Sequence, residues 1–260
     1  YAMTSSLVGS EMCIRDSILI NGLKSLEYRG YDSAGIALKN SNQVEVIKSI
    51  GKIVNLEEKI KSMEVIPSNL GIAHTRWATH GKPSEKNAHP HTIGKITLVH
   101  NGIIENAEEL REKLKKAGVT FNSETDTEVV AALINKYYEK NPVEAIDKAL
   151  KEVKGSYALG ILFQGDNDLY AVRKDSPLIV GLGKEENFIA SDIAAIIDYT
   201  NKYILLEEGE IAHITKDKLT TIPRFPRKLK MSISTSQPLL DGKLVLKPDW
   251  PKSNSGTLSI

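Results

Sequence analysis

The sequence predicts an α+β fold, with two antiparallel β-sheets packed face to face and helices on the outside. Three helical patterns are grouped between residues 105 and 153. Short strand patterns, separated by Gly, Asp and Asn, stand before and after that group. Strands that follow one another closely pair as hairpins, whereas a parallel sheet needs a long crossover between strands. The chain also shows no internal repeat.

The first third of the chain alternates helices and strands. Apolar residues recur at helical spacing from residue 18 to residue 26, and Gly30 follows, as is typical after a helix. We expect helices over 18–26 and near 56–63, and strands over 34–38, 44–50, 69–73 and 96–99. The polar segment 74–95 is predicted to hold little regular structure.

The second half begins with helices and continues with strands. Thr125 and Glu128 form a capping box that predicts the start of a helix at Asp126. The expected helices cover 105–116, 126–138 and 143–153. The expected strands cover 157–163, 169–172, 178–181, 188–190, 203–206 and 210–214.

The composition is that of a globular cytoplasmic protein. Of the 260 residues, 41% are hydrophobic and 26% are charged, which excludes a disordered chain. A net charge of +1 gives no reason to expect a nucleic-acid partner. Cys13 is the only cysteine, so no intrachain disulfide can form, and a reducing compartment is expected. Apolar runs are far shorter than the roughly 20 residues that span a bilayer, so no membrane partner is expected.

Residues 222–260 differ from the rest in composition. They hold seven Lys or Arg against two Asp, and five of the ten prolines. Proline interrupts helices and cannot donate to a sheet ladder. We interpret this stretch as a linker or disordered tail and residues 18–221 as one domain.

Five of the six histidines lie between His74 and His100. Such a cluster raises the possibility of a metal site, with Glu85 and Glu105 as further ligands. The spacing lacks a helical His-x-x-x-His pair, however, and no cysteine lies nearby. Histidines that hydrogen-bond the backbone of an irregular loop are the alternative, and we expect no metal or cofactor.

Three features could together recognise an amino acid. Arg76 follows a predicted strand, where a guanidinium can clamp a carboxylate. Asn101 and Gly102 end another strand and could place two donors on an oxyanion. Asp126, in the first turn of a helix, could hold an ammonium group. Each has an ordinary alternative: a surface ion pair, an Asn-Gly hairpin turn and a helix-dipole contact. Together they describe a site for an α-amino acid whose side-chain carbonyl is attacked, which glutamine satisfies.

The motifs around these residues resemble the glutaminase domain of the glutamine–fructose-6-phosphate aminotransferase family. The resemblance covers residues 18–215. It rests on the segments 28–35, 74–81, 83–85, 87–91, 100–106, 123–128, 176–178, 181–183, 188–192 and 206–212, together with Arg173.

The resemblance implies an N-terminal-nucleophile hydrolase fold, a four-layer α-β-β-α sandwich. It also implies a function for seven residues. Arg76 would bind the glutamine carboxylate, Asp126 would bind the amino group, and Thr79 and His80 would line the pocket. Asn101 and Gly102 would form the oxyanion hole, and Trp77 would gate the passage of ammonia. In the family an N-terminal Cys attacks the carboxamide. Partners implied are glutamine, fructose 6-phosphate bound by isomerase domains that this chain lacks, and further copies of the parent enzyme in a homo-oligomer.

The start of the chain departs from the family pattern. The family opens Met-Cys-Gly-Ile-Val-Gly, about two dozen residues ahead of Tyr-Arg-Gly, whereas Cys13 stands 15 residues ahead of Tyr28. Thr4 occupies the nucleophile's position by ungapped count, but the motif does not follow it. We therefore leave the nucleophile unassigned, interpret residues 1–17 as foreign, and expect the first strand to be missing, with an unpaired sheet edge. A chain that binds glutamine without hydrolysing it is the alternative function.

Overall fold

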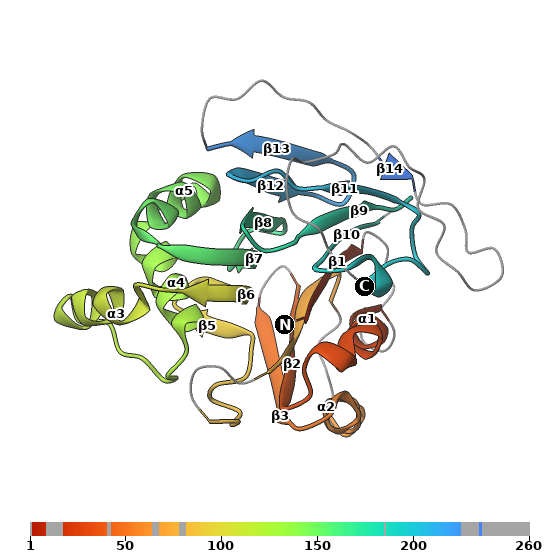
Figure 1. Cartoon of the computed structure of the whole chain (residues 1–260), viewed down its shortest axis with the longest axis horizontal. Helices are drawn as coiled ribbons and strands as arrows, with labels where there is room; N and C mark the ends of the chain where they lie inside the picture. Colours follow the sequence, from red (N-terminus) through yellow and green to blue (C-terminus); the bar gives the residue numbers. More distant parts are fainter. Residues whose placement is uncertain are drawn as a thin grey trace, which may run out of the picture.

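The computed structural model describes residues 2–8, 18–40, 43–63, 68–77, 82–184, 186–224 and 234–235. These residues form two β-sheets that pack face to face, with helices on both outer sides (Figure 1). The neighbouring strands of both sheets run antiparallel. The four-layer α+β sandwich predicted from the sequence is confirmed.

The first sheet has eight strands in the order β14-β11-β9-β10-β1-β4-β2-β3. Their bounds are Ala2–Val8 (β1), Ser33–Lys39 (β2), Val44–Ile50 (β3), Leu70–Arg76 (β4), Ile179–Leu182 (β9), Glu186–Ala190 (β10), Lys202–Leu205 (β11) and Ser234–Thr235 (β14). On its outer face lie α1 (Ile18–Leu26), α2 (Ile53–Lys61) and the short 3-10 helices η2 (Glu27–Arg29) and η3 (Ile193–Ala195).

The second sheet has six strands in the order β13-β12-β8-β7-β6-β5. Their bounds are His91–Ile93 (β5), Ile96–Ile104 (β6), Gly155–Phe163 (β7), Leu169–Lys174 (β8), Glu210–Ile214 (β12) and Leu219–Pro223 (β13). Its outer face is covered by α3 (Ala107–Lys116), α4 (Asp126–Tyr137) and α5 (Pro142–Glu152).

Strand alternation divides the core into three apolar layers. Side chains at odd and even positions of a strand point to opposite faces, so each sheet contributes to two layers. On β4, for example, Ile72 packs between the sheets, whereas Ala73 packs in the layer beneath α1 and α2. On β6, Val99 packs between the sheets and Leu98 beneath α3 to α5. This alternation decides which polar side chains of the two strands can meet.

Strand β1 corrects the expectation of a missing first strand. Ala2–Val8 lies inside the first sheet and pairs with β4 on one side and β10 on the other. The edge between β4 and β10 is therefore not open. Ala2 is opposite Thr75 and Met3 is opposite His74, so β1 begins at the end of β4 that carries Arg76. That residues 1–17 are foreign stays a prediction.

Three elements differ from the sequence-based expectation. Strand β6 runs five residues past Val99 because Gly102 allows the pairing with β7 to continue. Strand β5 lies inside the segment that was expected to be irregular. The boundary expected at residue 221 lies inside β13, in which Ile222 pairs with Ile211. Beyond β13, Arg224 contacts Asp147 and Tyr157. Pro223 is compatible with β13 because β13 is an edge strand.

Among the described residues, no helix is long and apolar enough to cross a membrane.

Candidate active site

Strand β4 directs two polar side chains toward the second sheet. His74 and Arg76 are two and four residues beyond Ile72, which packs between the sheets, so alternation places them on the same face. His74 is fully buried and Arg76 is 3% exposed. The charge of Arg76 contributes to lowering the pKa of both His89 and His91, which indicates that its guanidinium lies near these imidazoles.

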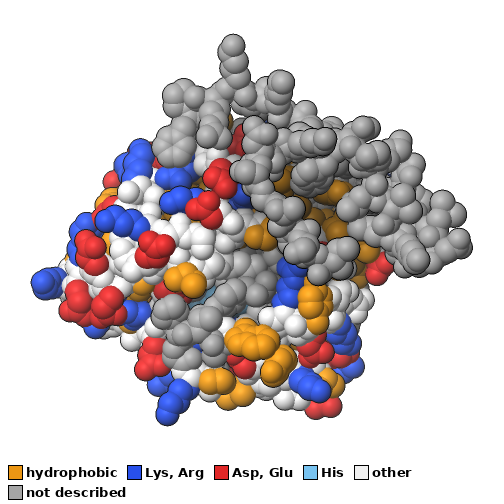
Figure 2. Space-filling model, in the orientation of Figure 1, with side chains coloured by type: hydrophobic (Ala, Val, Ile, Leu, Met, Phe, Trp, Pro, Cys, Tyr) orange, Lys and Arg blue, Asp and Glu red, His pale blue; other side chains and the backbone are white. Residues whose placement is uncertain are grey.

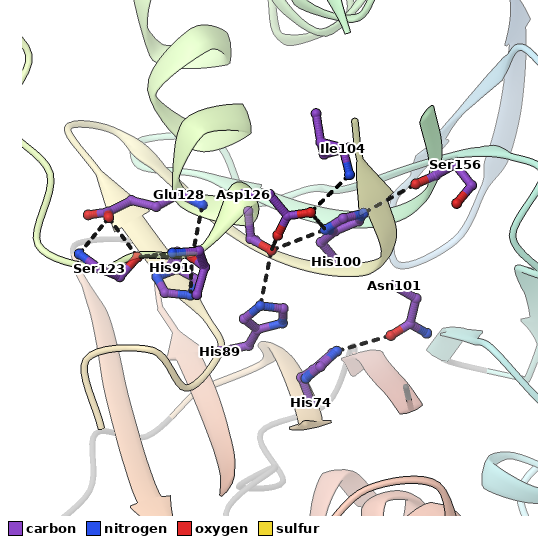
Figure 3. A network of polar contacts seen from close by, with 12 residues as sticks. His74, His89, His91, His100, Asn101, Ile104, Ser123, Asp126, Glu128 and Ser156 are labelled. Atoms are coloured by element: carbon purple, nitrogen blue, oxygen red, sulfur yellow. Dashed lines mark hydrogen bonds and ion pairs between the residues drawn. The ribbon is translucent and has the colours of Figure 1, made fainter. Parts of the chain in front are cut away.

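Strand β6 presents Asn101 to the same interface. Asn101 is two residues beyond Val99 and shares its inward face, whereas His100 points to the helices. The side chains of the two sheets meet in one hydrogen bond, between His74 Nε2 and Asn101 Oδ1 at 3.0 Å (Figure 3). Two of the predicted site strands are thereby joined at one end of the sandwich.

Gly102 continues the strand after Asn101 and does not form a hairpin turn. It is opposite Tyr157 on β7 and has a φ of 131°. A Cβ at this position would stand 2.2 Å from the carbonyl oxygen of Ser156. Only glycine is compatible with this backbone and this close approach. The Asn-Gly turn considered as an alternative is therefore wrong.

Asp126 links the start of α4 to the end of β6. Its Oδ2 accepts a hydrogen bond from the backbone N–H of Ile104 at 2.9 Å, and Thr127 Oγ1 lies 3.4 Å from Oδ1. Thr125 caps the helix by accepting from the N–H of Glu128, as predicted. The Asp126 carboxyl group is thus held two residues beyond Gly102 along β6, in a largely buried position.

The loop before Asp126 is held by two buried charged side chains. Arg111, on α3, donates to the carbonyl oxygens of Ser123 at 3.0 Å and Thr125 at 2.6 Å. Its guanidinium also lies 4.5 Å from the ring centroid of Phe121. Glu128 accepts from the N–H groups of Asn122 and Ser123 and from the Ser123 hydroxyl. Sequence reasoning missed the role of Arg111, which on a helix is not distinguishable from a surface cation.

Four of the clustered histidines lie between β4, β6 and α4: His74, His89, His91 and His100. All four are buried. Each bonds a side chain: His74 to Asn101, His89 and His100 to the Thr127 hydroxyl, and His91 to the Thr125 hydroxyl, all at 3.0 to 3.1 Å (Figure 3). Hydrogen bonds to backbone are present as well: His91 bonds the backbone of Asn87, His74 that of His100, and His100 lies 3.5 Å from the Ser156 carbonyl.

Burial keeps the imidazoles of His74, His89 and His91 uncharged. It lowers the pKa of His74 to about 3 and holds the pKa values of His89 and His91 well below their ordinary value. The rings of His74 and His89 are 4.1 Å apart, and those of His89 and His91 are 5.0 Å apart. In the part of the chain that the structure describes, no three His, Cys, Asp or Glu side chains are arranged to hold a metal ion.

Trp77 follows Arg76 on an exposed apolar surface. It is 52% exposed and contacts Tyr31 edge to face, with ring centroids 5.4 Å apart. Tyr28, Ile50 and Val54 are also exposed. Figure 2 shows several apolar side chains in the lower middle of the molecule, over the region where the lower ends of β2 and β3 lie in Figure 1. Gly30 lets η2 approach, since a Cβ there would stand 2.9 Å from the Arg76 carbonyl carbon.

Two expected pocket residues, Thr79 and His80, lie outside the described residues, as does Cys13, which is not expected to be the nucleophile. For Thr4, the structure gives only its backbone position in β1, opposite Ala73 of β4 and Ala190 of β10. The nucleophile stays unassigned.

Residues 74–198 match the family model of a glutamine amidotransferase domain. The matched range contains Arg76, Asn101, Gly102 and Asp126, together with the histidines described above. The chain carries a glutamine amidotransferase domain.

Curated relatives of this amidotransferase domain are named glutamine–fructose-6-phosphate aminotransferase (isomerizing). The *Acinetobacter baylyi* protein is 49% identical over 84% of this chain, and the *Aquifex aeolicus* protein is 51% identical over 81%. The chain spans only 37% and 36% of the length of these two relatives. The homologous region thus corresponds to a part of each relative.

Solved structures confirm the fold of the amidotransferase domain. The glutamine phosphoribosylpyrophosphate amidotransferase of *B. subtilis* aligns with a TM-score of 0.75 at 24% identity, over 87% of this chain and 50% of that chain. A glutamine aminotransferase class-II domain protein from *Silicibacter pomeroyi* aligns with a TM-score of 0.59 at 16% identity, over 86% of this chain and all of that chain. At these identities the likeness supports the architecture alone.

Proposed function

We propose that this domain binds glutamine and, given a nucleophile at the start of β1, hydrolyses it to glutamate and ammonia. The observation that carries the proposal is the hydrogen bond between His74 and Asn101, because it joins the strand of Arg76 to the strand of the oxyanion donors. Asp126 is tied to the same end of β6 through Ile104. A guanidinium, a carboxylate and amide donors on adjoining elements match the three polar ends of glutamine.

The proposed substrate position follows from charge and geometry. Arg76 would clamp the α-carboxylate with paired, charge-assisted hydrogen bonds. Asp126 would accept from the α-ammonium group through the oxygen that Ile104 does not occupy. The side-chain carboxamide would then extend toward Asn101 and Gly102. Thr79 and His80 are proposed to line the pocket, and Trp77 to gate the path by which ammonia leaves.

The proposed reaction proceeds in two steps. A nucleophile adds to the carboxamide carbon, and the negative charge on the former carbonyl oxygen is stabilised by the Asn101 amide and the Gly102 N–H. The adduct collapses, the C–N bond breaks, and the nitrogen takes up the proton that the nucleophile has lost and leaves as ammonia. Water then attacks the glutamyl–enzyme bond and releases glutamate and the free nucleophile. In the relatives' reaction this ammonia would serve amination of fructose 6-phosphate to glucosamine 6-phosphate.

The test replaces residues 1–17 with a start of the Met-Cys-Gly-Ile-Val-Gly type and measures ammonia release from glutamine. Strand β1 already lies between β4 and β10, so the new start would occupy a strand position that the sheet provides. We expect essentially no activity from the chain as it stands, and restored activity from the replaced chain. The same start with Ser in place of Cys is the matched control and should release far less ammonia.

An electrophilic glutamine analogue gives a direct readout by intact mass. The replaced chain should gain one adduct at its new Cys, and the original chain none at Cys13. A folded replaced chain that neither releases ammonia nor binds glutamine would refute the proposal. Glutamine binding without ammonia release in both chains would support the second candidate, a binding domain without hydrolysis.

The setting of the parent enzyme belongs to the same proposal. Relatives about 2.7 times as long as the matched region leave room for isomerase domains that bind fructose 6-phosphate and for assembly into a homo-oligomer. We propose the cytoplasm as its compartment, since a single cysteine in 260 residues is typical of proteins in a reducing environment.

A further inference from the structure

The Asn101 side chain has two different ends, and only one of them suits an oxyanion. Its Oδ1 faces His74 Nε2 at 3.0 Å, so its Nδ2 group points away from His74 (Figure 3). No residue in the described ranges accepts a hydrogen bond from Nδ2. With respect to the described residues, the amide hydrogens are available to a ligand. An amide turned by half a rotation would present a carbonyl oxygen instead, which would repel an oxyanion.

The protonation of His74 decides between these two arrangements. A carbonyl oxygen only accepts hydrogen bonds, so His74 Nε2 must carry the hydrogen in the observed contact. If the hydrogen were on Nδ1, the bare Nε2 would instead attract the Asn101 Nδ2 group and turn the amide around. His74 is fully buried and its ring lies 4.1 Å from that of His89, which is itself bonded to Thr127 at 3.0 Å. The ring is thereby restricted to one position.

We propose that His74 is a positioning residue whose Nε2–H tautomer orients the Asn101 amide with its N–H groups toward the reacting carboxamide. His74 touches neither substrate nor nucleophile in this scheme. It acts from the first sheet on a donor that belongs to the second. Because burial keeps His74 neutral, with a pKa of about 3, this orientation is constant throughout the physiological pH range. The inference rests on the proposed glutamine hydrolysis for its catalytic consequence, but not for the tautomer itself.

The tautomer is tested on the full chain as it stands, without any activity. Nitrogen NMR of protein labelled with ¹⁵N-histidine distinguishes the protonated from the bare ring nitrogen, and the His74→Gln variant assigns the signals of His74. We expect the Nε2–H tautomer, unchanged between about pH 5 and about pH 8. An Nδ1–H tautomer, or titration of His74 in that range, would overturn the inference whatever the activity of the chain.

The catalytic consequence is tested in the chain with the Cys-containing start. His74→Leu should lower kcat about 100-fold, the loss typical of a misplaced oxyanion donor, and change KM by less than about 3-fold. His74→Gln should fall between, because a Gln amide can offer either N–H or C=O to Asn101. Denaturation midpoints of the same variants identify any that fails to fold, in which case the Gln variant and the NMR measurement decide.

A double-mutant cycle separates positioning from general structural damage. If His74 acts through Asn101, then His74→Leu should cost almost nothing further in an Asn101→Ala background. Losses that multiply in the double variant would overturn the inference and leave the proposed function intact. A Cys-containing chain that releases no ammonia with His74 and Asn101 both present would count against the proposed function, and the NMR result would then decide the tautomer alone.

Discussion

Arg111 offers the sharpest test of how the site is held. Its guanidinium is buried, donates to two backbone carbonyls and packs over Phe121, all within the loop that leads into Asp126. Each hydrogen bond from a charged donor contributes about 1.5–3 kcal/mol, and the cation–π contact adds about 1 kcal/mol. Because these contributions are not additive, we expect Arg111→Met to lower the free energy of unfolding by about 3–5 kcal/mol.

Arg111→Lys refines this prediction. A lysine keeps the charge but reaches at most one of the two carbonyls with good geometry, and it loses the flat contact with Phe121. The expected loss is about 2–3 kcal/mol. Lys116→Met, an exposed position on the same helix, is the matched control and should stay within about 0.5 kcal/mol of the parent protein. Urea denaturation at neutral pH measures all three variants.

Glutamine titration adds the functional half of the test. If Arg111 fixes the loop that delivers Asp126, the Lys variant should remain folded at room temperature and bind glutamine several-fold more weakly. An unchanged free energy of unfolding in Arg111→Met would refute the conclusion that Arg111 holds this loop in place. Lower stability with unchanged glutamine affinity would show that the hydrogen bonds of Arg111 stabilise the loop but do not position Asp126.

Three further predictions follow from burial and close contacts. Gly30→Ala places a Cβ 2.9 Å from the Arg76 backbone, so the free energy of unfolding should fall by about 1–3 kcal/mol, measured by denaturation. Glutamine binding, measured by calorimetry, should become weaker because Arg76 is displaced. Equal glutamine affinities of the variant and the parent protein would show that this contact does not position Arg76. Burial lowers the pKa of Lys48 to about 8, so keeping this side chain charged in the folded state costs stability below that pH. Lys48→Met should therefore stabilise the fold by about 2 kcal/mol at pH 7 and progressively less toward pH 10. A gain in stability that did not change with pH would show that the lowered pKa of Lys48 is not its cause. Burial holds the pKa values of His89 and His91 well below the ordinary value. As the pH falls below about 6.5, the unfolded chain therefore binds protons at these histidines that the folded chain does not, and the free energy of unfolding should fall by about 1.4 kcal/mol per pH unit for each. His91→Gln should make this pH dependence shallower, as measured by urea titrations at several pH values.

Much of the fold could be predicted from the sequence because its signals are local. The cap at Thr125, the helical spacing in 18–26 and the strand 44–50 each depend on residues close together in the chain. The end of β6 was misjudged for the same reason. Asn-Gly is a common turn sequence, and only the neighbouring strand β7 shows that Gly102 continues the ladder.

The candidate site was predicted residue by residue but not as a network. The chemistry of Arg76, Asn101 and Asp126 taken together predicts an amino-acid site, whereas the contact of His74 with Asn101 joins residues 27 positions apart on different sheets. No sequence spacing encodes such a contact. The same holds for Arg111, whose partners lie beyond the end of its own helix and depend on how the loop folds back.

The position of β1 has a consequence for how the protein folds. Its neighbours are β4 and β10, and its partner residues in β10 are 186–190, nearly the whole domain away along the chain. While the chain is being synthesised, β1 and β4 can pair early, but the other side of β1 stays open until β10 emerges. An open strand edge attracts other chains, and contacts between residues far apart in sequence form slowly. The pairing of β1 with β10 should therefore be a late event in folding, and until it forms, the open edge of β1 is available for pairing with other chains.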